Sequence, residues 1–196
     1  MDIVFVTNNK NKLSEIKNLV SSDYNILSLE DINFNQEIEE TKNTLEANAL
    51  LKARYIHSKY GCNCFADDTG LEIDYLNGAP GVFSARYAGP KCLAKDNIDK
   101  VLLKLKGVKN RQAKFRTIIA LILENKEYTF EGECIGNISL KQKGKNGFGY
   151  DPIFTPNNFD LSFAQMSDAI KNKVSHRAKA VKKLVHFLSI TKLNKS

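Results

Sequence analysis

The stretch NCFADDTGLEIDY, Asn63 to Tyr75, holds two apolar runs separated by a pair of adjacent carboxylates. Asn63 to Ala66 and Leu71 to Tyr75 favour β-structure, so the sequence predicts two strands with a turn at Asp67 to Gly70. Asp and Thr often form turns because their side chains bond nearby backbone N–H groups. One acid would suffice for a turn, whereas two acids after an apolar run suit a metal site or a general base. Both interpretations remain open on this segment alone.

The residues that precede this stretch predict a helix from Leu45 to Tyr60. Apolar residues recur there at helical spacing, and either Asn43 or Thr44 can cap the first turn. Gly61 can end the helix in a left-handed conformation.

The rest of the chain alternates strand and helix patterns without an internal repeat or a linker. The further elements that we predict are a strand at Ile3 to Val6, a helix over Leu13 to Val20, a turn at Asn77-Gly78, a helix at Asp96 to Leu105, strands at Phe115 to Leu123 and Tyr128 to Ile138 around Glu124 to Lys126, and a helix at Arg177 to Ile190. This order indicates an α/β or α+β fold with a mixed sheet, in one domain over residues 1–196.

Composition is that of a globular protein: 42% of the 196 residues are hydrophobic and 26% are charged. No apolar run reaches the roughly 18 residues of a membrane span, and the first residues lack a signal-peptide pattern, so we expect a cytoplasmic protein. Four irregularly spaced cysteines suggest reduced thiols. The net charge of +7 implies an anionic partner, which could be RNA, a membrane face or a small phosphate compound. The lysine runs lack the interleaved aromatic residues of a single-strand binding platform.

Four further segments carry residues suited to a nucleotide. TNNKNK, Thr7 to Lys12, follows the first strand and could bind phosphate, although it could also be a solvated loop. EIEET, Glu37 to Thr41, places acids before a helix, where the helix dipole alone favours them. GFGYDPIF, Gly147 to Phe154, could stack on a base or could be a hairpin with core aromatics. SHRAKA, Ser175 to Ala180, offers polar groups that could read a base, with Ser175 also a plausible cap.

These segments, in this order, resemble the inosine triphosphate pyrophosphatase family, which hydrolyses non-standard purine nucleoside triphosphates. The matching stretches are TNNKNK, EET with LEANALLKAR, FADDTGLEIDYLNGAPGVFSARYAG, GFGYDPIF and KNKVSHRAKA, which together cover nearly the whole chain. The resemblance implies a long mixed central sheet flanked by helices, shaped into two lobes with an active-site cleft between them.

The resemblance also implies roles for individual residues. Asp68 would be the catalytic base and a magnesium ligand, Asp67 would support the metal site, and Glu40, with Glu39 as a rival, would complete it. Residues that would bind substrate are Thr7, Asn8, Asn9, Lys10, Asn11, Lys12, Lys52, Thr69, Arg86, Phe148, Gly149, Tyr150, Asp151, Lys171, Ser175, His176 and Arg177. Asn8 replaces the glycine that is usual in the first loop, and Thr69 stands where serine is common.

The expected activity is therefore Mg²⁺-dependent hydrolysis of ITP, dITP or XTP to the monophosphate and pyrophosphate. The family resemblance further implies a homodimer that binds neither membranes nor polymeric nucleic acid. Two alternatives remain: a pyrophosphatase for another modified nucleotide, and a non-catalytic basic RNA-binding module.

Overall fold

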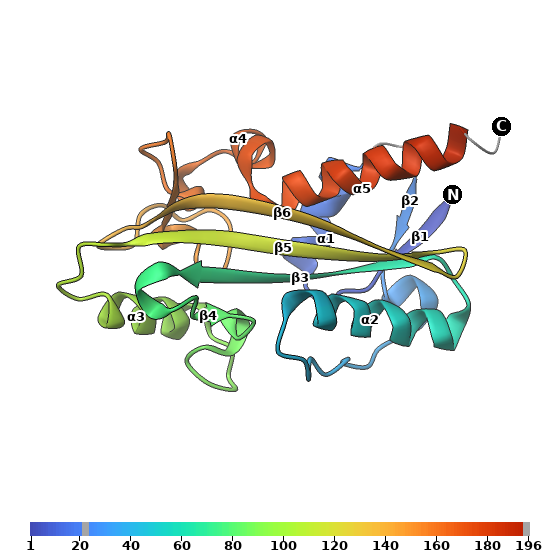
Figure 1. Cartoon of the computed structure of the whole chain (residues 1–196), viewed down its shortest axis with the longest axis horizontal. Coiled ribbons are helices and arrows are strands. Elements are labelled where there is room, and N and C mark those ends of the chain that lie inside the picture. Colours follow the sequence, from blue (N-terminus) through green and yellow to red (C-terminus); the bar gives the residue numbers. More distant parts are fainter. Residues whose placement is uncertain (21–23, 194–196) are drawn as a thin grey trace. The chain divides into compact units, whose positions relative to one another are not determined.

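The computed structural model of this chain describes residues 1–20 and 24–193 (Figure 1). Contacts divide the chain into two compact units, which are described separately below. Unit 1 comprises Met1–Asp68, Thr117–Gly132 and Arg177–Ser196. Unit 2 comprises Thr69–Arg116 and Glu133–His176. Within the described residues, no helix combines the length and apolarity needed to cross a membrane.

The strands of the described residues form one mixed sheet, as the sequence predicts. They hydrogen-bond in the order β2-β1-β3-β5-β6-β7, and β4 pairs with β3. β1 is parallel to β2 and β3, whereas β4 is antiparallel to β3 and β7 to β6. The strands are β1 (Asp2–Phe5), β2 (Asn25–Leu27), β3 (Cys64–Ile73), β4 (Pro80–Gly81), β5 (Gln112–Leu123), β6 (Lys126–Ile138) and β7 (Phe154–Pro156).

The helices follow the predicted periodicity closely. The α-helices are α1 (Lys10–Leu19), α2 (Leu45–Tyr60), α3 (Ala94–Lys104), α4 (Asp168–Val174) and α5 (His176–Leu193). Short 3-10 turns occur at η1 (Glu30–Ile32), η2 (Asp74–Leu76), η3 (Ser84–Arg86), η4 (Asp151–Ile153) and η5 (Phe163–Gln165). α2 has the predicted bounds: the Thr44 hydroxyl accepts a bond from the Ala47 N–H, and Gly61 ends the helix with a φ of 64°. α4 was not predicted from the sequence.

In unit 1, helices cover both faces of the strands (Figure 1). Ile16 of α1 and Leu184 of α5 share a buried cluster with the rings of Phe5 and Phe65, which stack with centroids 4.6 Å apart. α2 packs on the other face, where the Cys64 thiol bonds the carbonyl of Ala53. Successive residues of β3 therefore point to opposite helix layers.

In unit 2, a separate core forms around α3 and the aromatic side chains of β5 and β7. Phe115 contacts Phe154 and Phe163, with ring centroids 4.7 and 6.0 Å apart. Ile98 and Val101 of α3 complete the same cluster. This core supports the segment that carries the GFGYDPIF motif.

One secondary-structure prediction is wrong in an informative way. The sequence predicts two strands separated at Asp67 to Gly70, but β3 runs unbroken from Cys64 to Ile73. Gly70 allows β4 to approach this strand closely, because a Cβ there would lie 2.6 Å from the carbonyl oxygen of Gly81 on β4. The acid pair is therefore part of a strand, and its two side chains point in opposite directions.

The thiol prediction is confirmed. All four cysteines are free in the structure, and burial raises the pKa of the Cys64 thiol to about 12. Among the described residues, no group of three or more His, Cys, Asp or Glu side chains is arranged to hold a metal ion.

Candidate active site

The loop between β1 and α1 is fixed by its own polar side chains. The Asn9 side-chain oxygen accepts bonds from the backbone N–H groups of Asn11 and Lys12, at 3.0 and 3.1 Å. The Thr7 hydroxyl accepts from the Asn9 N–H at 3.2 Å. Asn8 has no positive φ, so its replacement of the family's glycine needs no strained backbone. The loop is a preformed helix start whose first free N–H groups are already capped.

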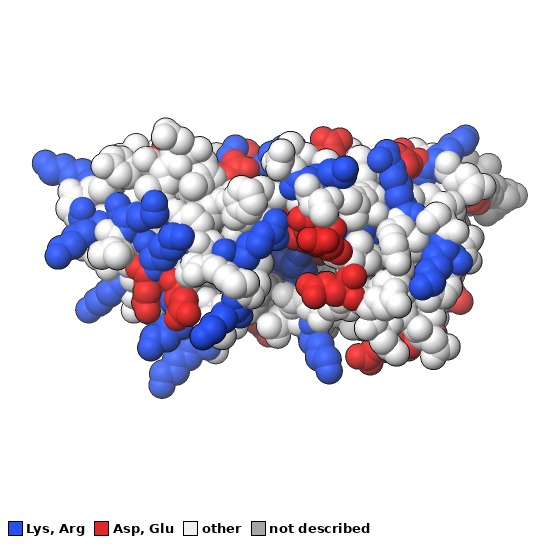
Figure 2. Space-filling view, turned by 90° about the horizontal axis from the view of Figure 1, so that it is seen from below, with Lys and Arg blue, Asp and Glu red and all other residues white. Residues whose placement is uncertain are grey.

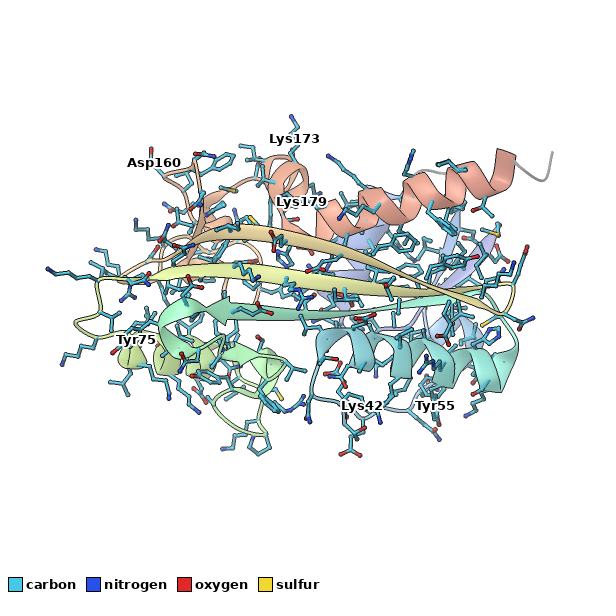
Figure 3. All side chains as sticks on the ribbon, in the orientation of Figure 1. Lys42, Tyr55, Tyr75, Asp160, Lys173 and Lys179 are labelled. Atoms are coloured by element: carbon cyan, nitrogen blue, oxygen red, sulfur yellow. The ribbon has the colours of Figure 1, made fainter. Side chains whose placement is uncertain are left out.

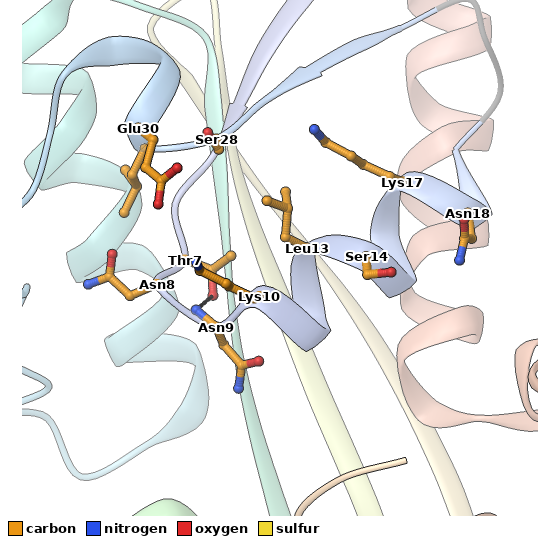
Figure 4. Close-up of a pocket in the computed structure, with 11 residues that line it drawn as sticks. Thr7, Asn8, Asn9, Lys10, Leu13, Ser14, Lys17, Asn18, Ser28 and Glu30 are labelled. Carbon is orange, nitrogen blue, oxygen red and sulfur yellow. Dashed lines mark hydrogen bonds between the residues drawn. The ribbon is translucent and has the colours of Figure 1, made fainter. Parts of the chain in front are cut away.

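A pocket of about 510 Å³ lies beside this loop (Figure 4). Thr7, Asn8, Asn9 and Lys10 line one part of it. The rest of the lining comes from outward side chains of α1 and from the segment Ser28 to Glu30. The predicted phosphate loop is thus accessible from this side.

On one face of β3, Asp67 is buried among cations. Its carboxylate accepts from Lys12 Nζ at 3.0 Å, and Arg177 Nε lies 3.5 Å from the other oxygen. Burial alone opposes ionisation, but the charges of Lys12, Arg177 and Lys52 together hold the pKa of Asp67 well below its usual range. Burial, partly offset by Asp67, lowers the pKa of Lys12. Asp67 is therefore a permanent anion that neutralises buried positive charge.

Arg177 lies in the first turn of α5 and is almost fully buried. Its guanidinium pairs with Glu15 of α1 as well as with Asp67. The sequence prediction gave Arg177 a base-reading role and did not include Glu15. A signal did exist, because Glu15 lies three residues after Lys12 and so shares its face of the helix.

On the other face of β3, Asp68 has a different environment. Its Oδ2 accepts a bond from the side-chain amide of Asn48 on α2, at 3.2 Å, and only 5% of the residue is exposed. Burial is the largest influence on its ionisation; Lys52 opposes burial and Glu40 reinforces it, and the result raises the pKa of Asp68 to about 6. Adjacent carboxylates on one strand thus differ in proton affinity because they face different layers.

Lys52 joins the acid-rich segment to β3. Its Nζ donates to Glu40 Oε1 at 2.6 Å and to the backbone carbonyl of Asp67 at 2.7 Å. Burial lowers its pKa, but the neighbouring acids Glu40, Asp68 and Asp67 outweigh burial, and the pKa is raised overall. Of the two glutamates that the sequence left as rivals, Glu40 is the one paired with Lys52, while Glu39 is exposed.

The residues of unit 1 form a site that combines carboxylates of different proton affinity with ammonium groups. It offers a carboxylate that titrates near neutral pH, a second carboxylate, and ammonium groups at Lys12 and Lys52. Such a set can accept a proton from water and neutralise phosphate oxygens. Asn48, which the sequence prediction missed, lies one helical turn before Lys52 and on the same face of α2.

In unit 2, the GFGYD segment closes on itself around Asp151. Asp151 Oδ2 accepts from the Phe148 N–H and from Lys171 Nζ, both at 2.8 Å. Gly147 has a φ of 74°, and a Cβ there would lie 2.1 Å from the Asp151 carboxylate. Lys171 Nζ lies 5.1 Å from the centre of the Phe148 ring, within cation–π range. An aromatic face, an acid and an ammonium are therefore held together.

The other predicted residues of unit 2 have mainly packing or backbone contacts. The His176 ring stacks on Phe115 with centroids 4.5 Å apart. Ser175 ends α4, where its N–H bonds the carbonyl of Lys171. The Tyr150 hydroxyl donates to the Ser84 carbonyl at 2.8 Å.

Two further predicted substrate contacts also lie in unit 2. Arg86 is on η3, with its guanidinium carbon 5.3 Å from the centre of the Phe83 ring. Thr69 lies on β3 directly after Asp68. Their predicted roles in substrate binding stay predictions.

Two Ham1 proteins of known structure have a fold similar to that of this chain. The Ham1 protein of Staphylococcus aureus is 37% identical with a TM-score of 0.88, and the match covers 96% of this chain and 98% of that one. A HAM1 protein from Coxiella burnetii is 36% identical, also with a TM-score of 0.88, over 96% and 98% of the two chains.

The sequence comparison agrees. The chain belongs to the Ham1 family, whose sequence model matches residues 3–187. A Flavobacterium johnsoniae protein named dITP/XTP pyrophosphatase is 54% identical over 192 residues, which are 98% of this chain and 100% of that protein. A Porphyromonas gingivalis protein of the same name is 48% identical over 97% and 98% of the two chains. The family resemblance indicated by the sequence motifs is confirmed.

Proposed function

We propose that this chain hydrolyses non-standard purine nucleoside triphosphates, with dITP, XTP and ITP as candidates, to the monophosphate and pyrophosphate. The observation that carries the proposal is the buried Asp68 carboxylate, whose pKa is raised to about 6 beside Lys52. Such a group is ionised at neutral pH and still basic enough to accept a proton. The names of the relatives at 54% and 48% identity support the substrate class.

In the proposed reaction, Asp68 accepts a proton from a water molecule as its oxygen attacks the α-phosphorus. The bond between the α-phosphorus and the bridging oxygen to the β-phosphate breaks, and pyrophosphate leaves with that electron pair. The Lys12 and Lys52 ammonium groups reduce the negative charge that develops on the phosphate oxygens. Asp68 then returns its proton to solvent.

A magnesium ion fits the residues on the α2 face of β3. Asp68 and Glu40 are hard oxygen donors, and Mg²⁺ is commonly bound by one or two carboxylates together with substrate phosphates. When bound, the ion would supply positive charge to the triphosphate. Asp67, engaged with Lys12 and Arg177, would support the site only through the strand.

We propose that the GFGYD segment and Lys171 recognise the base. The Phe148 ring offers a stacking face, which any base can use. Discrimination needs polar groups, and the Lys171 ammonium can only donate hydrogen bonds. It therefore suits the 6-oxo group of hypoxanthine or xanthine and would meet the amino group of adenine without an acceptor. A mismatch of this kind gives roughly 10- to 100-fold selectivity.

The experiment that tests this function measures pyrophosphate release from ITP, XTP, dITP, ATP, GTP and dUTP, with Mg²⁺ and with EDTA. We expect Mg²⁺-dependent release that is fastest with ITP, XTP and dITP and slow with ATP; guanine also carries a 6-oxo group, so the Lys171 contact separates these substrates from ATP and not from GTP. Fastest release from dUTP would favour a pyrophosphatase for another nucleotide. No release from any substrate would overturn the enzymatic proposal.

The second candidate function, a basic RNA-binding module, rests on the net charge of +7. Figure 2 shows one face of the molecule, where acidic side chains lie among the basic ones and no continuous basic band forms. RNA binding without pyrophosphate release would support the rival instead.

We also propose that the protein is a homodimer and acts in the cytoplasm. The first proposal rests on the family resemblance, and the second carries forward the expectation from the sequence. Light scattering coupled to size-exclusion chromatography would test the first, and cell fractionation the second.

A further inference from the structure

Asn48 is a buried polar side chain that no apolar packing argument explains. It lies on α2 with 0% of its surface exposed, next to Ala49 and one turn before Lys52. Burying an amide is unfavourable unless its hydrogen-bonding groups are satisfied. The contacts of Asn48 therefore indicate why an amide is present at this position.

The Asn48 amide binds two separate parts of the site. Its Oδ1 accepts from the backbone N–H of Lys42 at 2.9 Å. Its Nδ2 lies 3.3 Å from the carbonyl of Lys42 and 3.2 Å from Oδ2 of Asp68. A backbone N–H can only donate and a carboxylate can only accept, so these partners fix which end of the amide faces which group.

Both partners matter to the chemistry. Lys42 lies two residues after Glu40, on the segment that leads into α2 (Figure 3). Holding its N–H and carbonyl together fixes the backbone where Glu40 reaches Lys52, 2.6 Å away. The bond to Oδ2 restricts rotation of the Asp68 carboxylate. One side chain thus joins the acid-rich segment to the general base.

We infer that Asn48 is a positioning residue: it orients the Asp68 carboxylate for proton transfer and holds the Glu40 segment in register with it. This inference rests on the proposed function. In this role Asn48 acts through its hydrogen bonds to Asp68 and Lys42. Misplacement of a reacting group by about 1 Å can reduce the rate about 100-fold.

Two variants separate the two halves of this role. Asn48→Leu has a similar size and removes all three hydrogen bonds. Asn48→Asp keeps an oxygen acceptor for the Lys42 N–H but replaces the amide donor to Asp68 with a second carboxyl, which opposes ionisation of Asp68. If Asn48 only stabilised α2, any other substitution that weakened α2 to the same extent would lower kcat equally. Thr44→Ala supplies that control, because it removes the cap bond to Ala47 and has no contact with Asp68.

The experiment measures kcat and KM for the best substrate of the wild-type protein, the melting temperature, and hydrogen exchange of residues 37–44. We expect Asn48→Leu to lower kcat roughly 10- to 100-fold, to change KM less than about threefold, and to speed exchange of that segment. Asn48→Asp should lower kcat similarly while exchange stays slow. Thr44→Ala should lower the melting temperature by a few degrees with kcat within about twofold of wild type.

Several outcomes would overturn the inference. Wild-type kcat in both Asn48 variants would remove Asn48 from the mechanism, and an equal kcat loss in Thr44→Ala would make its role that of a helix support. If Asn48→Leu does not fold, Asn48→Asp decides the matter through kcat. Absence of turnover by the wild-type protein is a different result: it overturns the proposed function, and the positioning role in that reaction falls with it.

Discussion

The substitution Asp68→Asn should stabilise the fold while it removes activity. Folding raises the pKa of this carboxyl from 3.8 to about 6, chiefly through burial. The folded state therefore binds more protons than the unfolded chain between these values, and stability falls as the pH rises through this window. At 1.36 kcal/mol per pKa unit, the penalty at pH 8 is on the order of 3 kcal/mol. Asn removes the charge and can still accept from the Asn48 amide.

The assay is thermal or urea unfolding of wild type and Asp68→Asn from pH 4 to pH 8, in EDTA so that no metal biases the carboxylate. We expect the variant to be more stable by up to ~3 kcal/mol at pH 8, with the difference shrinking toward pH 4. Its pyrophosphate release should fall at least ~100-fold. If the variant is less stable than wild type at pH 8, or if the difference does not change with pH, the assigned environment of Asp68 is wrong.

Three other substitutions test the rest of the site. Asp67→Asn removes the carboxylate that pairs with Lys12 and with Arg177, while Arg177 keeps its pair with Glu15. The free energy of unfolding at pH 7 should fall by about 3 kcal/mol, measured by urea denaturation; an unchanged midpoint would contradict the pairing. Lys52→Met keeps the length of the side chain but removes its charge and the pair with Glu40. Steady-state kinetics should therefore show a higher KM and a lower kcat. Normal values for both would exclude Lys52 from phosphate binding. Gly147→Ala places a methyl group against the Asp151 carboxylate at a positive φ, so the melting temperature should drop by several degrees; a melting temperature equal to that of wild type would show that the GFGYD turn relaxes freely.

Local rules predict much of this fold. The bounds of α2 follow from Thr44 and Gly61, since a cap and a left-handed glycine act within a few residues. The β5–β6 turn is equally local, with a positive φ at Glu124 and Asn125. The continuity of β3 is not local. β3 pairs there with β4, where Gly70 approaches Gly81 too closely for a Cβ, and no periodicity in the sequence indicates that contact.

The sequence predicts the candidate site only at residues that lie in its charged motifs. The roles of Lys12, Lys52 and Asp68 come from the family resemblance of the charged motifs that contain them, whereas the residues alone also allow a turn or a solvated loop. Asn48 is uncharged, and its contact with Asp68 can be recognised only once the register between α2 and β3 is known. Arg177 was predicted from its motif to read the base. In the structure its guanidinium pairs with Glu15 and Asp67, so a base-reading role stays a prediction.

Asp67 and Asp68 differ in proton affinity because of the way a β-strand orients neighbouring side chains. Residues next to each other on a strand face opposite sides, so the pair is divided between two helix layers. The α1 and α5 layer supplies Lys12 and Arg177, which keep Asp67 ionised and engaged. The α2 layer supplies a neutral amide and one ammonium that Glu40 already pairs with, so burial prevails and the proton affinity of Asp68 rises. A turn would expose both acids to solvent and erase this difference. The unbroken strand is therefore what makes one carboxylate a structural anion and the other a base, and the chemistry proposed for this chain depends on it.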